Sequence, residues 1–152
     1  MQVREMPPFA PVLMESTRAI GYSLEAAIAD IIDNSIAAKA DKVQLFFFPI
    51  DNAYVSILDN GAGIHNTQID VAMQYGSKSP TDMRDANDLG RYGLGLKTAS
   101  LSQCRVLTVV SKQGDQVIGR RWDLDYVIKT GAWSLLILDK EDFASVPHIS
   151  DL

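Results

Sequence analysis

Three short clusters in this chain combine residue types and spacings that could carry out chemistry. The first is Asp30-Ile31-Ile32-Asp33-Asn34-Ser35, in which Asp30 and Asn34 are four residues apart. On a helix these two side chains would lie about 40° apart, on one face. An amide oxygen beside a carboxylate suits a hard cation such as magnesium, and a carboxylate one turn away could orient or deprotonate a water. An ordinary solvated helix face would carry the same residue types.

The second cluster, Asp59-Asn60-Gly61-Ala62-Gly63, follows a run rich in valine, isoleucine and tyrosine. Glycines allow positive φ angles and close approach of the backbone to a planar ligand. A carboxylate at the end of a strand can accept a hydrogen bond from an exocyclic amine. The same letters would also fit a simple Asx turn followed by glycines that end the strand.

The third cluster is Gly90-Arg91-Tyr92-Gly93-Leu94-Gly95-Leu96-Lys97-Thr98. Its glycines lead into a predicted helix, whose free N–H groups and dipole favour a phosphate, and Lys97 could add a positive charge. Polar residues precede it where a dinucleotide-binding fingerprint needs a buried strand, and no Gly-Lys-Ser/Thr completes a Walker A loop. A glycine hinge before a helix is the alternative interpretation.

The surrounding pattern predicts the elements that position these clusters. Ser23 is a candidate N-cap for a helix over 24–39, which carries the first cluster on an otherwise apolar stripe. Strands over 42–49 and 53–58 flank Asp51-Asn52 as a hairpin. The other predicted elements are helices at 11–20, 67–75 and 94–103, strands at 104–111, 116–122 and 133–138, and a polar loop at 76–93. Segregated helices and strands favour an α+β fold, a two-layer α/β sandwich.

Composition limits the function classes. The length of 152 residues fits one domain, and no apolar run approaches the ~20 residues of a membrane span. One cysteine excludes an internal disulfide, and with two histidines it excludes the usual zinc sites. A net charge of −5 argues against broad nucleic-acid binding. With no apolar signal-peptide core at the N-terminus, we expect a cytoplasmic protein without membrane association.

Together, the order and spacing of the clusters resemble the GHKL superfamily of DNA gyrase B, the heat-shock chaperone, histidine kinases and MutL, and are nearest to its MORC-like and MutL-like branches. The resemblance covers about residues 16–138. Asp30-x-x-Asp33-Asn34-Ser35 is similar to the N-box, Asp59-x-Gly61-x-Gly63 to the adenine box, and Gly90-x-x-Gly93-x-Gly95 to the box that closes the ATP lid. It implies the Bergerat ATP-binding fold, a mixed and mostly antiparallel sheet with helices on one face, with 76–93 as the ATP lid.

The resemblance also implies roles for individual residues. Asp30 takes the position of the general base, and Asn34 that of the Mg²⁺ ligand. Asp59 should bond the adenine amine. The remaining residues expected to contact ATP are Gly61, Gly63 and Ile64 at the adenine, and Lys78, Gly90, Gly93, Gly95, Lys97 and Thr98 at the phosphates.

Two departures from the family pattern affect activity. The general base of the family is usually Glu, and Asp30 is one methylene shorter; the later Gly-Thr that supports adenine binding is absent from this chain. We therefore expect a slow ATPase. The resemblance implies that residues 1–152 are the N-terminal ATP-binding domain of a longer, dimerising machine, with a nucleotide-dependent homodimer in the full-length protein. The alternatives are a histidine-kinase-type catalytic domain and a nucleotide-binding switch without turnover.

Overall fold

The computed structural model describes residues 3–19, 21–75 and 95–152. The predicted ATP lid at 76–93, with Lys78, Gly90 and Gly93, lies outside the described residues. In chain order the elements are α1 (Ala10–Arg18), α2 (Leu24–Ala37), β1 (Val43–Phe48), β2 (Tyr54–Asp59), α3 (Asn66–Met73), α4 (Gly95–Gln103), β3 (Val106–Gln113), β4 (Gln116–Asp123), α5 (Leu124–Thr130), β5 (Leu136–Ile137), α6 (Lys140–Phe143) and a 3₁₀ turn (Ile149–Asp151).

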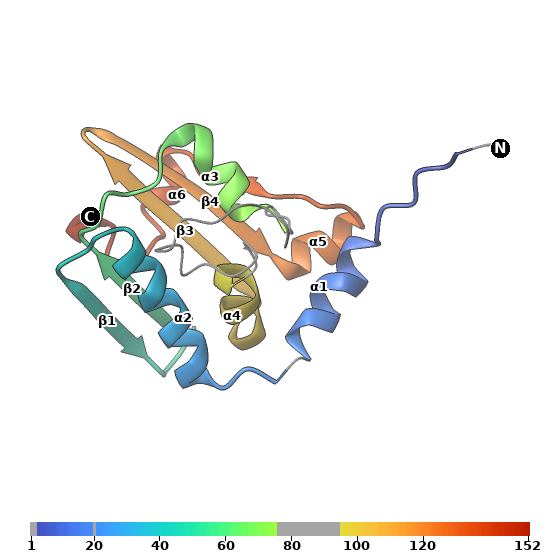
Figure 1. Ribbon diagram of the computed structural model, residues 1–152, viewed down its shortest axis with the longest axis horizontal. Helices are drawn as coiled ribbons and strands as arrows, with labels where there is room; N and C mark the ends of the chain where they lie inside the picture. The colour runs from blue at the N-terminus through green and yellow to red at the C-terminus, as the bar shows by residue number, and fades with distance from the viewer. Residues whose placement is uncertain (1–2, 20, 76–94) are drawn as a thin grey trace.

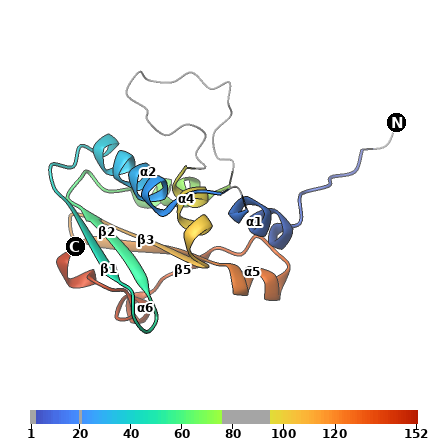
Figure 2. The same ribbon diagram turned by 90° about the horizontal axis from the view of Figure 1, so that it is seen from below.

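The elements form a layer of strands with helices packed against it, which confirms the predicted α+β class (Figure 1). The described strands pair antiparallel in two ladders, β1–β2 and β3–β4–β5. Seen from the side, α1, α2 and α4 lie together on one face of the strands, whereas α6 lies on the other (Figure 2).

Strand β4 shows how side-chain alternation separates the two faces. Trp122 and Arg120 both reach α3: the Trp122 indole donates to the Met73 carbonyl at 2.9 Å, and Arg120 Nε donates to Asp70 at 2.6 Å. Gly119, the residue before Arg120, faces α6 on the opposite side, where an added Cβ would come within 2.8 Å of the Phe143 ring. The absence of a side chain there lets α6 pack closely against the strand.

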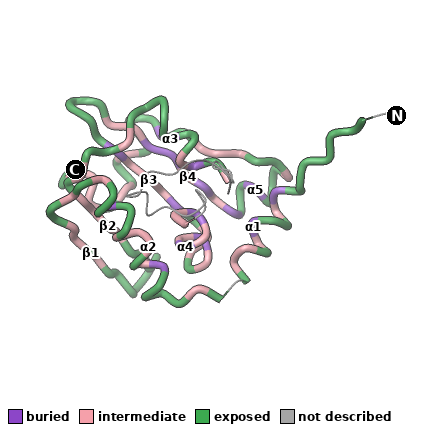
Figure 3. Tube along the Cα trace, in the orientation of Figure 1, coloured by how far each residue is buried: buried purple, intermediate pink, exposed green. Residues whose placement is uncertain are grey.

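The hydrophobic core lies where α1, α3, α4 and α5 meet β3 and β4. Its largest fully buried members are Met14, Ile69, Met73, Leu101, Leu124 and Val127. Figure 3 shows the buried residues following β3, β4 and α4, whereas α2 and the β1–β2 hairpin are mostly intermediate or exposed. The first two clusters therefore lie at the margin of the core, where a ligand could reach them.

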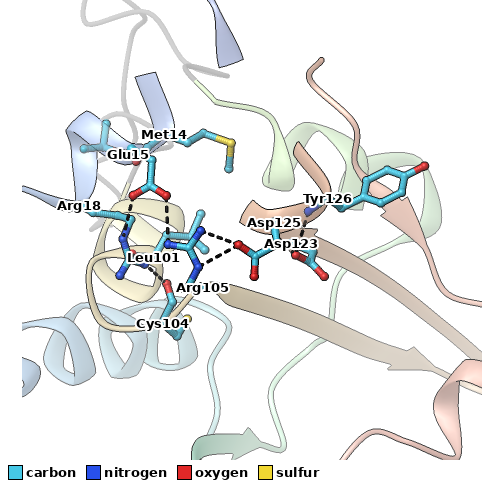
Figure 4. Close-up of polar contacts among 10 residues, drawn as sticks. Met14, Glu15, Arg18, Leu101, Cys104, Arg105, Asp123, Asp125 and Tyr126 are labelled. Carbon is cyan, nitrogen blue, oxygen red and sulfur yellow. Dashed lines mark hydrogen bonds and ion pairs between the residues drawn. The ribbon is translucent and has the colours of Figure 1, made fainter. Parts of the chain in front are cut away.

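An ion-pair network fastens α1 to this core (Figure 4). Arg105, just before β3, pairs with Glu15 of α1 at 3.0 Å and with Asp125 of α5 at 2.6 Å. Arg18 donates to the carbonyls of Leu101 and Cys104 at the end of α4. Because the last carbonyls of a helix lack partners within the helix, Arg18 completes the hydrogen bonding of α4 while holding α1 beside it.

The sequence pattern missed α5 and α6 and overestimated β5. Asp123 is the N-cap of helix α5, and its side chain accepts from the backbone N–H groups of Asp125 and Tyr126. Gly131, with φ +65°, is the C-cap. The strand predicted over 133–138 shortens to Leu136–Ile137. It pairs with β4 only opposite Arg120 and Arg121.

Candidate functional site

Helix α2 presents the first cluster. The Ser23 hydroxyl accepts from the Ala26 N–H at 3.2 Å, which confirms the predicted N-cap. Ala27 and Ser35 are the buried residues of the helix, so they mark the face that packs inward. Asp30 is partly exposed and Asn34 is exposed. Both lie on the face adjoining the buried one, open to a ligand.

The phenol of Tyr22, which lies just before helix α2, holds Asp30 in place. The Tyr22 hydroxyl donates to Asp30 Oδ2 at 2.7 Å. This hydrogen bond, followed by burial and the carboxylate charge, raises the pKa of Tyr22 above 10.0. Tyr22 therefore remains a protonated donor at neutral pH, and one oxygen of Asp30 has a fixed partner.

Asp59, the last residue of β2, connects the first two clusters. Its Oδ2 accepts from the Ser35 hydroxyl of α2 at 2.9 Å, and its Oδ1 accepts from the Gly61 N–H at 2.8 Å. A carboxylate has about four acceptor positions, so Asp59 retains capacity for a further donor. The structure thus brings the N-box helix and the glycine loop together around one carboxylate.

The two glycines of this loop are required by close packing within the protein. A Cβ at Gly61 would lie 2.9 Å from Ala38, and one at Gly63 would lie 2.7 Å from the Lys112 carbonyl. Gly63 also has φ +69°, which favours glycine. The Ala62 N–H donates to the Ala38 carbonyl at 2.9 Å, so the loop is pinned to the end of α2.

Strand β3 supports the loop from the other side. The Ser111 hydroxyl accepts from the Ile64 N–H at 2.6 Å, and Gln113 Nε2 donates to the Ala62 carbonyl at 3.0 Å. Ile64 is partly buried against the core cluster. The loop that carries Asp59 is therefore held by both α2 and β3.

Of the third cluster, residues 95–98 lie in the described chain, in the first turn of α4, which packs beside α2. They include the three candidate residues Gly95, Lys97 and Thr98. The Lys97 side chain is 1% exposed and its ammonium donates to the Ala72 carbonyl at the end of α3, at 2.7 Å. Burial lowers the pKa of Lys97 from 10.5 to about 8. Its charge therefore sits inside the protein, between α3 and α4.

The side chains of the described residues could bind a magnesium ion only if phosphate oxygens supplied the other ligands. No group of three or more Asp, Glu, His or Cys side chains that could hold a metal occurs among the described residues. Magnesium commonly takes one or two side-chain oxygens and fills its shell with phosphate and water. The exposed amide of Asn34 meets that requirement.

Sequence reasoning missed the three hydroxyl groups that organise the site, those of Tyr22, Ser35 and Ser111. The burial of Ser35 could have been predicted, because it is a polar residue on the apolar stripe of a helix. Tyr22 and Ser111 gave none, since their partners lie 8 and 47 residues away along the chain.

Comparison with known families decides the class. The family model for histidine kinase-, DNA gyrase B- and HSP90-like ATPases matches residues 22–151 of this chain. The chain belongs to this family. Membership confirms the GHKL resemblance and supports ATP binding and an ATPase-type function for this GHKL domain.

Individual relatives agree with the MutL-like and MORC-like branches. The chain is 25% identical over 95 residues to the DNA mismatch repair protein MutL of Persephonella marina, covering 61% of this chain and 18% of that protein. It is 29% identical over 89 residues to the ATPase morc-1 of Caenorhabditis elegans, covering 58% and 10%. A MutL of Aeromonas hydrophila is 27% identical over 123 residues, covering 76% and 19%.

The chain thus spans less than a fifth of the length of these curated relatives. None of the helices in the described part of the chain combines the length and hydropathy that crossing a membrane would need.

Proposed function

We propose that this GHKL domain binds Mg·ATP against the polar face of α2, the loop after β2 and the first turn of α4, and hydrolyses it slowly. The observation that carries the proposal is the position of Asp59. Its carboxylate is held by Ser35 and by the Gly61 N–H, so one acceptor group sits where the N-box helix and the glycine loop meet.

Adenine recognition is assigned to this junction. Asp59 accepts from the adenine amine with its remaining lone pairs, whereas guanine presents a carbonyl at that position. Gly61 and Gly63 let the loop pack closely against α2 and β3, and the partly buried Ile64 is assigned to the lining of the adenine site.

The phosphates are assigned to the first turn of α4, beside α2. The backbone N–H groups of Gly95, Lys97 and Thr98 lie in the first turn of α4, where N–H groups lack partners within the helix. Asn34 supplies an oxygen ligand to magnesium, which, when bound, neutralises charge on the transferred phosphoryl group. Contacts from Lys78, Gly90 and Gly93 stay predictions from the family pattern.

Asp30 is assigned as the general base that accepts a proton from the attacking water. Two features make turnover slow. The aspartate side chain is one methylene shorter than the glutamate the family uses, and the Lys97 ammonium is engaged with the Ala72 carbonyl. A charged group aimed at the charge that develops in the transition state is commonly worth several kcal/mol in an active site. Because the Lys97 ammonium points to Ala72 instead, it does not supply this stabilisation, and hydrolysis is slower.

Two substitutions on α2 test the assignment by separating binding from turnover. Asp30→Asn should keep ATP affinity within about twofold and reduce phosphate release by about 100-fold or more, the usual worth of a general base. Asn34→Ala should weaken ATP binding in magnesium buffer but not in EDTA. Calorimetry and labelled-phosphate release measure both. Unchanged hydrolysis by Asp30→Asn would place the base elsewhere, with Asp33 the next candidate.

The relatives' names suggest a setting for this activity. One is a DNA mismatch repair protein and one is an ATPase, and both are several times longer than this chain. We place the chain as the ATPase module of a machine that dimerises when it binds nucleotide. Light scattering of the full-length protein with and without a non-hydrolysable ATP analogue tests this assembly.

A further inference from the structure

The hydrogen bond between Tyr22 and Asp30 has no counterpart in the family pattern, because Tyr22 lies outside all three clusters. It joins the residue just before the Ser23 N-cap to the second turn of α2, at 2.7 Å. The phenol therefore reaches back over the first turn of the helix and contacts the carboxylate assigned as the base.

Tyr22 is itself held in place from a second element. Gln103, the last residue of α4, donates from Nε2 to the Tyr22 carbonyl at 2.7 Å. Gly21, with φ +83°, turns the chain immediately before it. The end of α4 thus holds the backbone of Tyr22, and Asp30 holds its phenol. The second oxygen of Asp30 accepts no hydrogen bond from the described residues.

We propose that Tyr22 is a positioning residue for hydrolysis, which holds Asp30 Oδ2 so that Oδ1 faces the attacking water. This inference rests on the proposed function. A short carboxylate has fewer rotatable bonds but also less reach, so its direction matters more than that of a glutamate. Misplacing a catalytic group by about 1 Å can cost roughly 100-fold in rate, and the phenol prevents such rotation.

The test compares Tyr22→Phe, which removes only the hydroxyl, with the native chain. We expect kcat for ATP to fall at least about tenfold while KM stays within about twofold, since Tyr22 is not assigned to ATP binding. Tyr126→Phe is the matched control, because Tyr126 is an exposed residue of α5 and should leave kcat unchanged. Gln103→Leu should lower kcat less than Tyr22→Phe does.

A second measurement tests the Tyr22–Asp30 hydrogen bond without measuring ATP hydrolysis. In ¹³C NMR of labelled tyrosine, Asp30→Asn should lower the pKa of the Tyr22 phenol toward its ordinary value, since Asp30 is the main cause of the raised pKa. No change in that titration would overturn the contact. Higher or unchanged kcat in Tyr22→Phe would overturn the positioning role.

Comparing Asp30→Asn with Tyr22→Phe separates an error in the role of Tyr22 from an error in the assignment of the base. If Asp30→Asn abolishes hydrolysis and Tyr22→Phe does not slow it, only the role of Tyr22 is wrong. If Asp30→Asn hydrolyses ATP like the native chain, the base assignment is wrong, and with it the role of Tyr22. Should Tyr22→Phe fold poorly, the Gln103→Leu variant and the Asp30→Asn titration still decide the outcome.

Discussion

At the scale of single residues, Asp59 has two tasks that a mutation must separate. It accepts hydrogen bonds from Ser35 and from the Gly61 N–H, which shape the loop, and it is the acceptor proposed for the adenine amine. Replacing it removes both, so a loss of ATP binding alone would not identify which task matters.

We expect Asp59→Ala to weaken ATP binding by about 1.5–3 kcal/mol, the usual worth of a hydrogen bond to a charged group. Ser35→Ala is the matched control, because it removes one of the loop contacts and keeps the carboxylate. Calorimetry with ATP and GTP measures the effect. Native protein that binds the two nucleotides equally, or a Ser35→Ala loss as large as that of Asp59→Ala, would contradict the adenine assignment.

At the scale of elements, Lys97 links the helices on either side of residues 76–94. Its side chain extends from the first turn of α4, and its ammonium donates to the Ala72 carbonyl near the end of α3. A cation at the C-terminus of a helix is favourable and stabilises the charged form of Lys97. Burial of the ammonium disfavours that charged form. The lowered pKa, about 8, shows that burial dominates.

This lowered pKa predicts a pH dependence of stability. From about pH 8 to 10.5 the unfolded chain holds the Lys97 proton and the folded chain releases it, so the free energy of unfolding rises with pH across that window. Below pH 8 both states are protonated and the slope vanishes. Urea unfolding of native protein and Lys97→Met measures the difference, with the exposed Lys129→Met as the charge control. A native-minus-variant difference that is flat from pH 8 to 10.5 would contradict the burial of this charge.

Elements also show how far the sequence could be interpreted. Helix α2 and the β1–β2 hairpin were predicted within two residues because local signals, the Ser23 cap and the apolar periodicity, determine them. Helix α5 was missed because its tyrosine, valine and isoleucine favour strands, although Asp123 and Gly131 marked both ends. The burial of Lys97 could not be foreseen, since it depends on how α3 meets α4, which no local pattern encodes.

At the scale of the whole molecule, the loop after β2 joins the two ladders. Ser111 and Gln113 of β3 hold it from one ladder, while Asp59 ends β2 of the other. The sequence located the loop but not this link, since pairing between distant strands leaves no trace in local spacing. A ligand bound at Asp59 would therefore rest on both halves of the fold.

The Ser111 hydroxyl tests this link. Ser111 is 5% exposed, and Ser111→Ala leaves the Ile64 N–H without its acceptor, which should lower the free energy of unfolding by about 1–3 kcal/mol. Because the freed loop must also be ordered when ATP binds, ATP affinity should fall as well. The exposed Ser16→Ala, whose hydroxyl bonds to a carbonyl of its own helix, should change stability by no more than about 0.5 kcal/mol. Denaturant unfolding and calorimetry on the same samples measure both quantities. If Ser111→Ala destabilises the fold but binds ATP as tightly as the native chain, the loop does not carry the nucleotide, and the site lies elsewhere on α2.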